Sequence, residues 1–299
     1  MYVNGYKIRD NILNMTKIAV VTGSSSGIGY ETSLLLARNQ YTTYASMRNM
    51  KKSDELLKIA SKENIPLKVI HLDVNDDRSV SSAIDSIVKE NGRIDVLVNN
   101  AGFDLFGSLE ELTIEEIKGQ FETNFFGAAR VTKNVIPTMR KQGSGIIINV
   151  SSIGGRIGLV PCNTMYHASK FALEGFTESL RHELTEFNID VILIEPGAIR
   201  SNFAENIRTA KNYDSNNSPY AKTVQKVFEG FEPMLANASD PKEVAQVILN
   251  AANSSSPNIR YTVGKDAESI LKARAELSDR ELEKWVRESF MDKKGFIRE

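Results

Sequence analysis

The feature that most limits the folds open to this chain is a regular alternation of short apolar runs and longer amphipathic stretches. An apolar run of about four to eight residues is typical of a strand buried on both faces of a parallel sheet. Because strands and helices alternate throughout, the pattern predicts an α/β protein with a doubly wound parallel sheet in three α/β/α layers. The strand-like runs lie at residues 17–22, 41–46, 67–72, 94–98, 145–150, 190–194 and 260–263, and the helical patterns at 27–39, 51–63, 77–90, 113–141 and 164–187.

The remaining segments set the domain organisation. Residues 1–15 are polar and aperiodic, so we expect a flexible N-terminal extension or an artefact of the start site. Residues 16–299 are expected to form one domain, since α/β units of this length are common. Residues 200–240 are polar and weakly periodic, which predicts an insertion that is either a mobile lid or a surface excursion. Further helical patterns follow at 241–253, 266–276 and 279–291.

Composition argues against several broad classes of protein. The 299 residues are 41% hydrophobic and 25% charged, which is ordinary for a globular protein with a sizeable core. A formal net charge of -1 and a pI near 6.4 do not favour nucleic acid or a membrane surface as partner. Cys162 is the only cysteine, which excludes an internal disulfide and fits a reducing compartment. No apolar run is long enough to span a bilayer, and we expect a cytoplasmic protein.

A glycine-rich segment, Thr22-Gly-Ser-Ser-Ser-Gly-Ile-Gly29, lies between the first predicted strand and the first predicted helix. Backbone amides at a helix N-terminus bind phosphate, and a pyrophosphate reaches them only where side chains are small. This placement predicts the phosphate loop of a Rossmann fold that binds a dinucleotide; the alternative is a small-residue turn that packs helix on strand. The residues expected at the phosphates are Gly23, Ser25, Ser26, Gly27, Ile28 and Gly29.

The residues after the second predicted strand indicate which dinucleotide binds. An NAD site usually has an acidic residue there, about 20 residues beyond the glycines, to bind the ribose hydroxyls. No acid occurs from Thr32 to Ser53, whereas Arg48 follows Tyr44-Ala-Ser-Met47. A guanidinium at this position can pair with the extra phosphate of NADP, so we expect NADP(H) to be preferred over NAD(H). The two lysines that follow fit the solvated start of a helix.

The segment Tyr166-His-Ala-Ser-Lys170 places a phenol and an ammonium four residues apart in a predicted helix, and therefore on one face. A neighbouring cation stabilises a phenolate and lowers the pKa of the tyrosine. We expect an acid/base pair in which Tyr166 exchanges the proton and Lys170 lowers its pKa. The alternative is a core tyrosine beside a lysine whose apolar stem is buried. The three histidines lack the spacing of a metal site, and no metal is expected.

These motifs occur in an order that resembles the short-chain dehydrogenase/reductase family, from Lys17 to about Gly264. The motifs that carry the resemblance are residues 22–29, His71-Leu-Asp-Val74, Asn99-Asn-Ala-Gly102, Asn124, Ser152, Tyr166 with Lys170, and Pro196-Gly197. The resemblance implies hydride transfer between a nicotinamide cofactor and a carbonyl or alcohol. It also implies further cofactor contacts by Asp73 and Val74 at the adenine, Asn99 and Ala101 along the adenosine, Pro196, Gly197 and Ile199 at the nicotinamide, and Ser201 where a threonine is often found.

The resemblance further implies the roles of the catalytic residues. Tyr166 and Lys170 would also contact the cofactor, with Lys170 holding the nicotinamide ribose. Ser152 would orient the substrate oxygen by a hydrogen bond. Asn124, in the long helix at 113–141, would anchor a water that relays protons to solvent.

Two adjacent serines compete for the substrate-orienting role. Ser152 precedes Tyr166 by fourteen residues, one more than the family spacing, so Ser151 is a rival. We favour Ser152 because it is third after Asn149, at the end of a predicted strand. Either serine could otherwise be an ordinary hydroxyl that satisfies the backbone at a strand end.

The expected function is the NADP(H)-dependent interconversion of a carbonyl and an alcohol on a small, apolar substrate. The alternatives are a 3-oxoacyl thioester reductase and a protein that senses NADP(H) without catalysis. Apolar residues at 103–106 and 160–162 would line a substrate pocket or simply pack their loops. The resemblance implies a homodimer or homotetramer built on the helices at 113–141 and 164–187.

Overall fold

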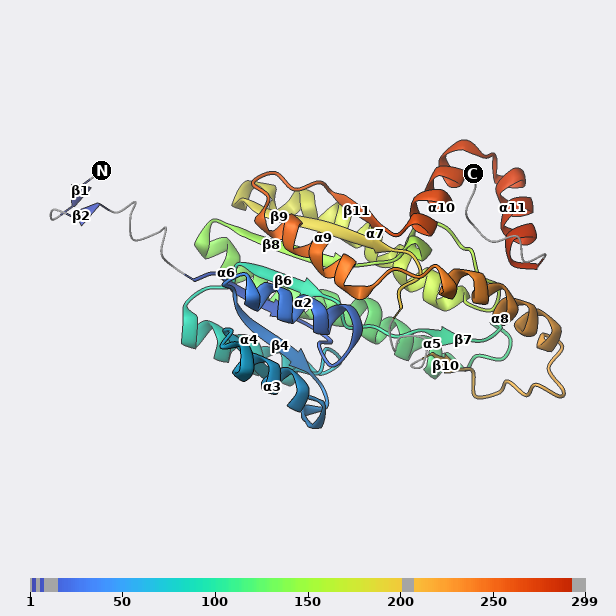
Figure 1. The fold of residues 1–299 in the computed structure, drawn as a ribbon, viewed down its shortest axis with the longest axis horizontal. Helices are drawn as coiled ribbons and strands as arrows, with labels where there is room; N and C mark the ends of the chain where they lie inside the picture. The colour runs from blue at the N-terminus through green and yellow to red at the C-terminus, as the bar shows by residue number, and fades with distance from the viewer. Residues whose placement is uncertain (1, 4–5, 8–15, 201–206, 292–299) are drawn as a thin grey trace.

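The computed structural model describes residues 2–3, 6–7, 16–200 and 207–291, and its seven predicted strands form one sheet (Figure 1). All neighbouring strands are parallel, in the order β11-β9-β8-β6-β3-β4-β5. The chain order reverses beside β3, so a doubly wound sheet is confirmed and its switch point lies between β3 and β6. The strands are β3 (Ile18–Val21), β4 (Thr42–Met47), β5 (Leu67–His71), β6 (Val96–Asn99), β8 (Gly145–Val150), β9 (Ile189–Pro196) and β11 (Arg260–Val263).

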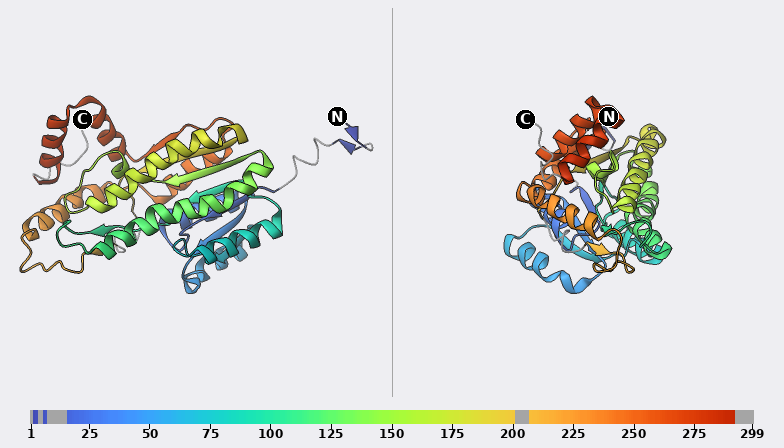
Figure 2. Two further views of the ribbon diagram at one scale, coloured as in Figure 1. Left: turned by 180° about the vertical axis from the view of Figure 1, so that it is seen from behind. Right: turned by 90° about the vertical axis from the view of Figure 1, so that its right-hand side faces the viewer.

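Helices cover both faces of the sheet (Figure 2). On one face lie α2 (Gly27–Arg38), α3 (Asp54–Glu63) and α9 (Pro241–Asn253). On the other lie α4 (Asp77–Asn91), α6 (Gly127–Gln142) and α7 (Thr164–Leu184). Short helical turns precede α3 as η1 (Met50–Lys52), follow β8 as η3 (Ile153–Gly155) and follow α7 as η4 (Thr185–Phe187). The predicted three-layer arrangement is therefore confirmed.

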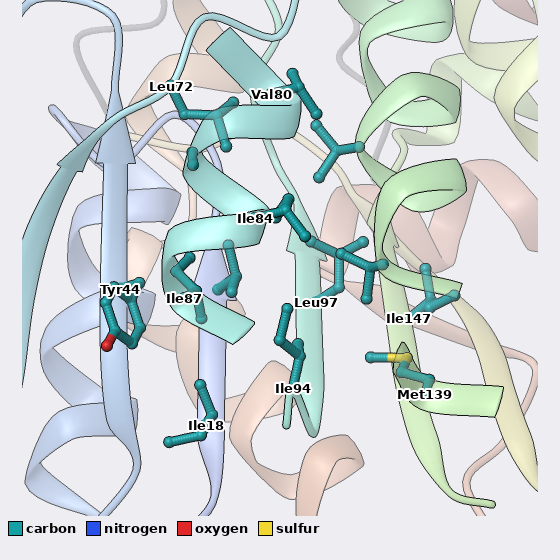
Figure 3. Packing of buried hydrophobic residues seen from close by; sticks show 14 of the residues in the cluster. Ile18, Tyr44, Leu72, Val80, Ile84, Ile87, Ile94, Leu97, Met139 and Ile147 are labelled. Atoms are coloured by element: carbon teal, nitrogen blue, oxygen red, sulfur yellow. The ribbon is translucent and has the colours of Figure 1, made fainter. Parts of the chain in front are cut away.

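The strands are buried on both faces because they are continuously apolar. Figure 3 shows the cluster on the α4 and α6 side, where Leu97 and Ile147 of the sheet meet Ile84 and Ile87 of α4. Each of these side chains is almost completely buried, and such burial stabilises a fold by about 1.5–3 kcal/mol per side chain. The core therefore holds the carboxyl ends of the strands in fixed register.

Side chains that cap the helices set where several of them begin. Asp76 accepts a hydrogen bond from the backbone of Ser79 at the start of α4. Thr113 and Glu116 form a reciprocal capping box before α5 (Ile114–Phe121). A second box, with Asp240 as the cap, precedes Pro241 at the start of α9. These caps satisfy backbone amides that have no partner inside the helix.

The continuous helix predicted at 113–141 is interrupted. It consists of α5, a π-helical turn η2 (Glu122–Phe126) and α6. Within η2 the amide of Gly127 bonds to the carbonyl of Glu122, five residues back. A π turn takes up one extra residue within a continuous run of helical backbone, so the sequence pattern predicted a single helix.

The insertion predicted at 200–240 contains a regular element that its sequence pattern did not indicate. Helix α8 (Ala221–Ala236) buries Val224 and Val227 against Phe106, and α10 (Lys265–Glu276) and α11 (Asp279–Met291) follow the last strand as predicted. The two-residue strands β7 (Leu105–Phe106) and β10 (Arg208–Thr209) pair in parallel. Figure 1 shows these elements at the end of the molecule toward which the strand arrows point.

The segment before β3 contains β1 (Tyr2–Val3) and β2 (Tyr6–Lys7), which pair antiparallel. The rest of the predicted N-terminal extension lies outside the described residues. Of the helices that the structure describes, none combines the length and the apolar character needed to cross a bilayer. Nor do the described residues contain a cluster of three or more side chains suited to a metal ion.

Candidate active site

The glycine-rich segment forms a tight turn from β3 into α2. Gly23 and Gly27 have φ angles of +71° and +59°, which favour glycine, and Ser26 precedes the helix without a side-chain capping bond. The first turn of α2 carries no acidic residue. The free amides and the positive end of the helix dipole therefore face the switch point of the sheet without competition from a carboxylate.

Two residues that sequence reasoning did not single out hold this turn in place. Asn100 donates from Nδ2 to the carbonyls of Thr22 and Gly23, at 2.9 and 3.2 Å. The Thr22 hydroxyl accepts from the amides of Asn100 and Ala101, at 3.0 and 3.1 Å. The end of β6 is thus fastened to the end of β3. The signal that could have revealed this is the second asparagine of Asn99-Asn-Ala-Gly102.

The residues of this edge fit a dinucleotide. A Cβ on Gly23 would lie 2.8 Å from the Ala101 Cα, so the turn passes directly under the backbone after β6. The amide of Ser24 bonds to the Ser46 carbonyl, which joins the turn to the end of β4. Arg48 follows β4 and is exposed beside this junction. The free amides suit a pyrophosphate and the guanidinium suits a phosphate on the ribose.

The residues predicted at the adenosine do not all present their side chains to the cofactor cleft. Asp73 follows β5, where Oδ1 accepts from the amide of Asn75, and Val74 packs against Gly127. Asn99 is only 4% exposed, and its Nδ2 donates to Thr132 and Asn149 in the core. These core partners engage the side-chain amide of Asn99. Its place beside the adenosine of a cofactor stays a prediction.

Of the residues predicted at the nicotinamide, Pro196 ends β9, and Gly197 and Ile199 follow it. The amide of Gly197 donates to the Val263 carbonyl of β11, and Ile199 bridges to Ser239. Asp266, in the first turn of α10, accepts from the amide of Ala198 at 2.7 Å. A Cβ on Gly197 would lie 2.4 Å from the Asp266 carboxylate, so glycine is needed for this approach. Ser201 lies outside the described residues.

Asp266 is a residue that the sequence pattern did not mark as functional. It belongs to the predicted helix at 266–276 and looks like an ordinary acid in a first turn. Burial raises the pKa of its carboxyl, while hydrogen bonds from the backbone lower it in part. Its role is to hold the turn after Pro196 against α10.

Tyr166, Lys170 and Ser152 lie together at the carboxyl ends of the strands. The Lys170 ammonium lies 5.8 Å from the Tyr166 ring centroid and donates to the carbonyl of Val150, the last residue of β8, at 2.9 Å. A hydrogen bond joins the Ser152 hydroxyl to the Tyr166 phenol. The Ser152 Oγ also accepts from the amide of Gly154 at 3.0 Å. Because the Oγ accepts from this amide, the serine keeps its own proton for donation to an oxygen such as that of the phenol.

Burial is the largest influence on the pKa of Tyr166 and on that of Lys170. It raises the pKa of Tyr166, the charge of Asp104 raises it further, and the bond from Ser152 lowers it in part. The lowered pKa predicted from the Tyr166 and Lys170 spacing is thus not found in this structure. Burial lowers the pKa of Lys170 to about 8, opposed by Glu174 and Asp104, so the ammonium still predominates at neutral pH.

The two competing serines have different surroundings. Ser152 lies beside the Tyr166 phenol, as described above. The Oγ of Ser151 is buried near Glu174, and a Cβ on Gly155 would lie 2.9 Å from that oxygen and from the Glu174 Cγ. The structure therefore brings Ser152, and not Ser151, to the phenol. Its catalytic role stays a prediction.

Asn124 occupies the π-helical turn η2 and is 2% exposed. Its Oδ1 accepts from the amide of Phe103, and its Nδ2 donates to the Phe103 carbonyl and to Ser169, at 3.0, 3.0 and 3.2 Å. Ser169 in turn donates to the carbonyl of Tyr166 at 2.7 Å. These contacts tie α7 to the segment after β6 through the side chain of Asn124. The role of Asn124 as an anchor for a water stays a prediction.

His167 connects the serine segment to α7. Its Nδ1 lies 2.9 Å from the Gly154 carbonyl, and its Nε2 accepts from the amide of Val160 at 3.2 Å. Both contacts are satisfied by a neutral ring with its proton on Nδ1. Burial lowers the pKa of His167, which favours this neutral form. His167 therefore joins the serine segment to the start of α7.

The apolar residues considered for a substrate pocket differ in how deeply the structure buries them. Leu105 and Phe106 are 2% exposed and belong to the buried clusters under β10 and α8. Cys162 packs in the same cluster as Phe106. These three side chains therefore fit the loop-packing alternative. Phe103 is half-buried and carries the Arg208 guanidinium 3.9 Å above its ring.

Comparison with protein families and curated sequences gives consistent matches. The family model described as short chain dehydrogenase matches residues 17–212. An uncharacterised oxidoreductase of Bacillus subtilis is 39% identical over 253 residues, covering 83% of this chain and 89% of that protein. A 3-ketodihydrosphingosine reductase of Bacteroides thetaiotaomicron is 36% identical, covering 83% and 88%. Human retinol dehydrogenase 8 is also 36% identical, covering 82% and 83%.

Solved structures show the same similarity. A short-chain dehydrogenase from Streptomyces avermitilis superposes with a TM-score of 0.77 at 32% identity, covering 91% of this chain and 98% of that one. A variant of actinorhodin polyketide ketoreductase, solved with NADPH, has a TM-score of 0.71 at 27% identity and covers 83% and 96%. ElxO, solved with NADP, has a TM-score of 0.68 at 29% identity and covers 83% and 97%.

Proposed function

Since the chain belongs to the short-chain dehydrogenase/reductase family, we propose that it is an NADP(H)-dependent enzyme that interconverts a carbonyl and an alcohol. The observation that carries the proposal is the grouping of Ser152, Tyr166 and Lys170 at the strand ends, on the same edge as the turn at Gly23–Gly29. Ligands of open α/β sheets bind at this edge, beside the switch point.

The residues of the site suit proton transfer to a carbonyl oxygen. The nicotinamide cofactor, when bound, supplies the hydride that goes to the carbonyl carbon. Tyr166 donates its phenol proton to the carbonyl oxygen, which becomes the alcohol hydroxyl. Ser152 donates a hydrogen bond to the same oxygen and so stabilises the charge that develops there. Lys170 stabilises the tyrosinate that remains until solvent returns a proton, and the reverse sequence oxidises the alcohol.

A spectrophotometric assay tests the proposal directly. NADPH consumption is measured with a panel of aliphatic, aromatic and lipid-like ketones and aldehydes, and NADP reduction with the matching alcohols. Turnover of a carbonyl that depends on NADPH is expected. Tight binding of NADPH without turnover of any member would favour the alternative of a cofactor sensor, and turnover confined to 3-oxoacyl thioesters would favour the thioester reductase.

The substrate is proposed to be small and apolar beside its carbonyl. Two relatives are named for lipophilic substrates, a 3-ketodihydrosphingosine reductase and a retinol dehydrogenase. In this chain α8 and the paired strands β7 and β10 lie beside the strand ends of the central sheet (Figure 1). We propose that the insertion at 200–240 closes over such a substrate, and that residues 16–299 act as one catalytic domain.

Cofactor preference gives one prediction. Arg48→Ala is expected to raise the KM for NADPH about tenfold or more and to leave that for NADH nearly unchanged, because only NADPH carries the phosphate that pairs with the guanidinium. Steady-state kinetics with both cofactors measure the change. Lys51→Ala is the matched control, since that residue is exposed and lies within η1. An unchanged preference in Arg48→Ala would contradict the assignment.

The serine assignment gives another prediction. Ser152→Ala is expected to lower kcat/KM about a hundredfold, which is typical of losing one donor to a developing oxyanion. Ser151→Ala removes a hydroxyl of the same type beside Glu174 and is expected to cost far less activity. Parallel kinetics of the two variants decide between them. A larger loss in Ser151→Ala would reverse the assignment.

Assembly and location complete the proposal. We propose a homodimer or homotetramer in which η2 and α7 pair with their copies, supported by Phe126 and Phe171, which are 49% and 47% exposed on these elements. Light scattering would measure the mass in solution. The single cysteine supports a cytoplasmic location.

A further inference from the structure

Asp104 is a buried carboxylate that the proposed mechanism does not use. It follows Phe103 in the segment between β6 and β7 and is only 6% exposed. Its backbone carbonyl accepts from the amide of Arg208 at the start of β10. The residue is therefore fixed between the end of the central sheet and the insertion, where a charge is seldom left without a reason.

The carboxylate is attached to the helix that carries the catalytic pair. Its Oδ2 accepts from Nδ2 of Asn163 at 3.1 Å, and Asn163 is the residue that precedes α7. The first turn of α7 carries no acid of its own, so the positive end of its dipole is open to this charge. The other carboxylate oxygen, Oδ1, is buried, and no hydrogen-bond partner for it is found among the described residues.

The charge of Asp104 acts on both members of the pair. It raises the pKa of Tyr166 and opposes the lowering of the pKa of Lys170. Burial raises the pKa of Asp104 itself to about 6, which Asn163 and Lys170 oppose, so the carboxylate is mostly ionised at neutral pH. The ionisable groups on the surrounding elements are Tyr166 and Lys170 of α7, Arg208 of β10, Glu111, which accepts from Ser108, and Cys162.

Resting on the proposed function, we propose that Asp104 is a positioning residue for the proton transfer, whose buried negative charge keeps the proton on the Tyr166 phenol. A phenol can donate to a carbonyl oxygen, whereas a phenolate can accept from an alcohol. The carboxylate therefore favours carbonyl reduction at neutral pH and confines alcohol oxidation to alkaline pH. Lys170 opposes this effect by stabilising the phenolate, so the two charges together set the working range.

The test is the pH profile of Asp104→Asn, which keeps the shape of the side chain and removes its charge. Profiles of kcat/KM are measured for carbonyl reduction and for alcohol oxidation. In each profile, the limb that follows ionisation of the Tyr166 phenol is expected to move to lower pH by about one unit. This is the effect of removing a nearby like charge. Oxidation near neutral pH then rises by up to about tenfold. Should this variant not fold, Asp104→Ser supplies a smaller neutral side chain for the same measurement.

Two controls separate charge from structure. Asn163→Ala removes the 3.1 Å hydrogen bond but leaves the charge of Asp104 at alkaline pH, so its limbs are expected to stay in place. Glu111→Gln removes another buried carboxylate from the same segment and is also expected to leave them. If Asn163→Ala moves the limbs as far as Asp104→Asn does, packing and not charge is responsible, and the proposal is overturned.

A direct titration distinguishes failure of this inference from failure of the proposed function. Ultraviolet difference spectra record phenolate formation in the parent and in Asp104→Asn, each with and without Tyr166→Phe, so that the difference belongs to Tyr166. A midpoint that is unmoved by Asp104→Asn, while Tyr166→Phe is inactive, overturns only the role of Asp104. Full activity in Tyr166→Phe would instead overturn the proposed function.

Discussion

Tyr166→Phe is expected to lower kcat between about a hundredfold and about ten-thousandfold, the range for removing a positioned acid/base group. Its affinity for NADPH should stay close to that of the parent, because the phenyl ring keeps the volume of tyrosine and its place near the Lys170 ammonium. Ser152 loses only its bond to the phenol. Turnover with a carbonyl substrate and a fluorescence titration of NADPH measure the two quantities separately.

A matched control is provided by Tyr44, a buried phenol on β4. Its hydroxyl bonds to Glu90 and Asn91 on the far part of α4, so Tyr44→Phe should cost about 1 kcal/mol of stability and leave kcat unchanged. Denaturant unfolding and the same turnover assay test both statements. If Tyr166→Phe kept most of its turnover, the proton would have to come from another group, and the proposed mechanism would be wrong.

The fold could be predicted because its central elements obey one local rule. A strand buried on both faces must be apolar throughout, and the helices between must carry one apolar face. Both patterns can therefore be recognised in the sequence. Residues such as Val20 and Ile147 are fully buried for this reason. Helix α8 was not predicted because its apolar residues pack against the two-residue strand β7, at Phe106, and follow a segment of polar turns.

The side chains of the site were harder to predict than their positions. Asn99 and Asn124 stand where the family order places them, yet their amides bond to core partners whose proximity depends on the fold. The pKa of Tyr166 likewise depends on burial and on Asp104, which lies 62 positions earlier in the chain. Spacing within one helix shows which groups share a face, and it cannot show how much water surrounds them.

Gly29→Ala is expected to impair the use of NADPH by disturbing the phosphate turn between β3 and α2. A Cβ there would lie 2.4 Å from Nδ2 of Asn100 and 2.5 Å from the carbonyl of Gly23. Asn100 is the side chain that holds the phosphate turn, so it cannot yield without releasing the Thr22 and Gly23 carbonyls. We expect overpacking to cost about 1–3 kcal/mol of stability and kcat/KM for NADPH to fall about a hundredfold through misplacement of the turn.

Gly119→Ala separates this effect from a general effect of glycine replacement. Gly119 lies in α5, where an added Cβ would meet nothing within 4 Å, so the change should raise stability by about 0.5–1 kcal/mol through helix propensity. Thermal unfolding and NADPH kinetics are measured for both variants. Gly29→Ala is expected to lower the free energy of unfolding and Gly119→Ala to raise it. If Gly29→Ala bound NADPH as tightly as the parent, the turn from β3 into α2 would not be where the pyrophosphate lies.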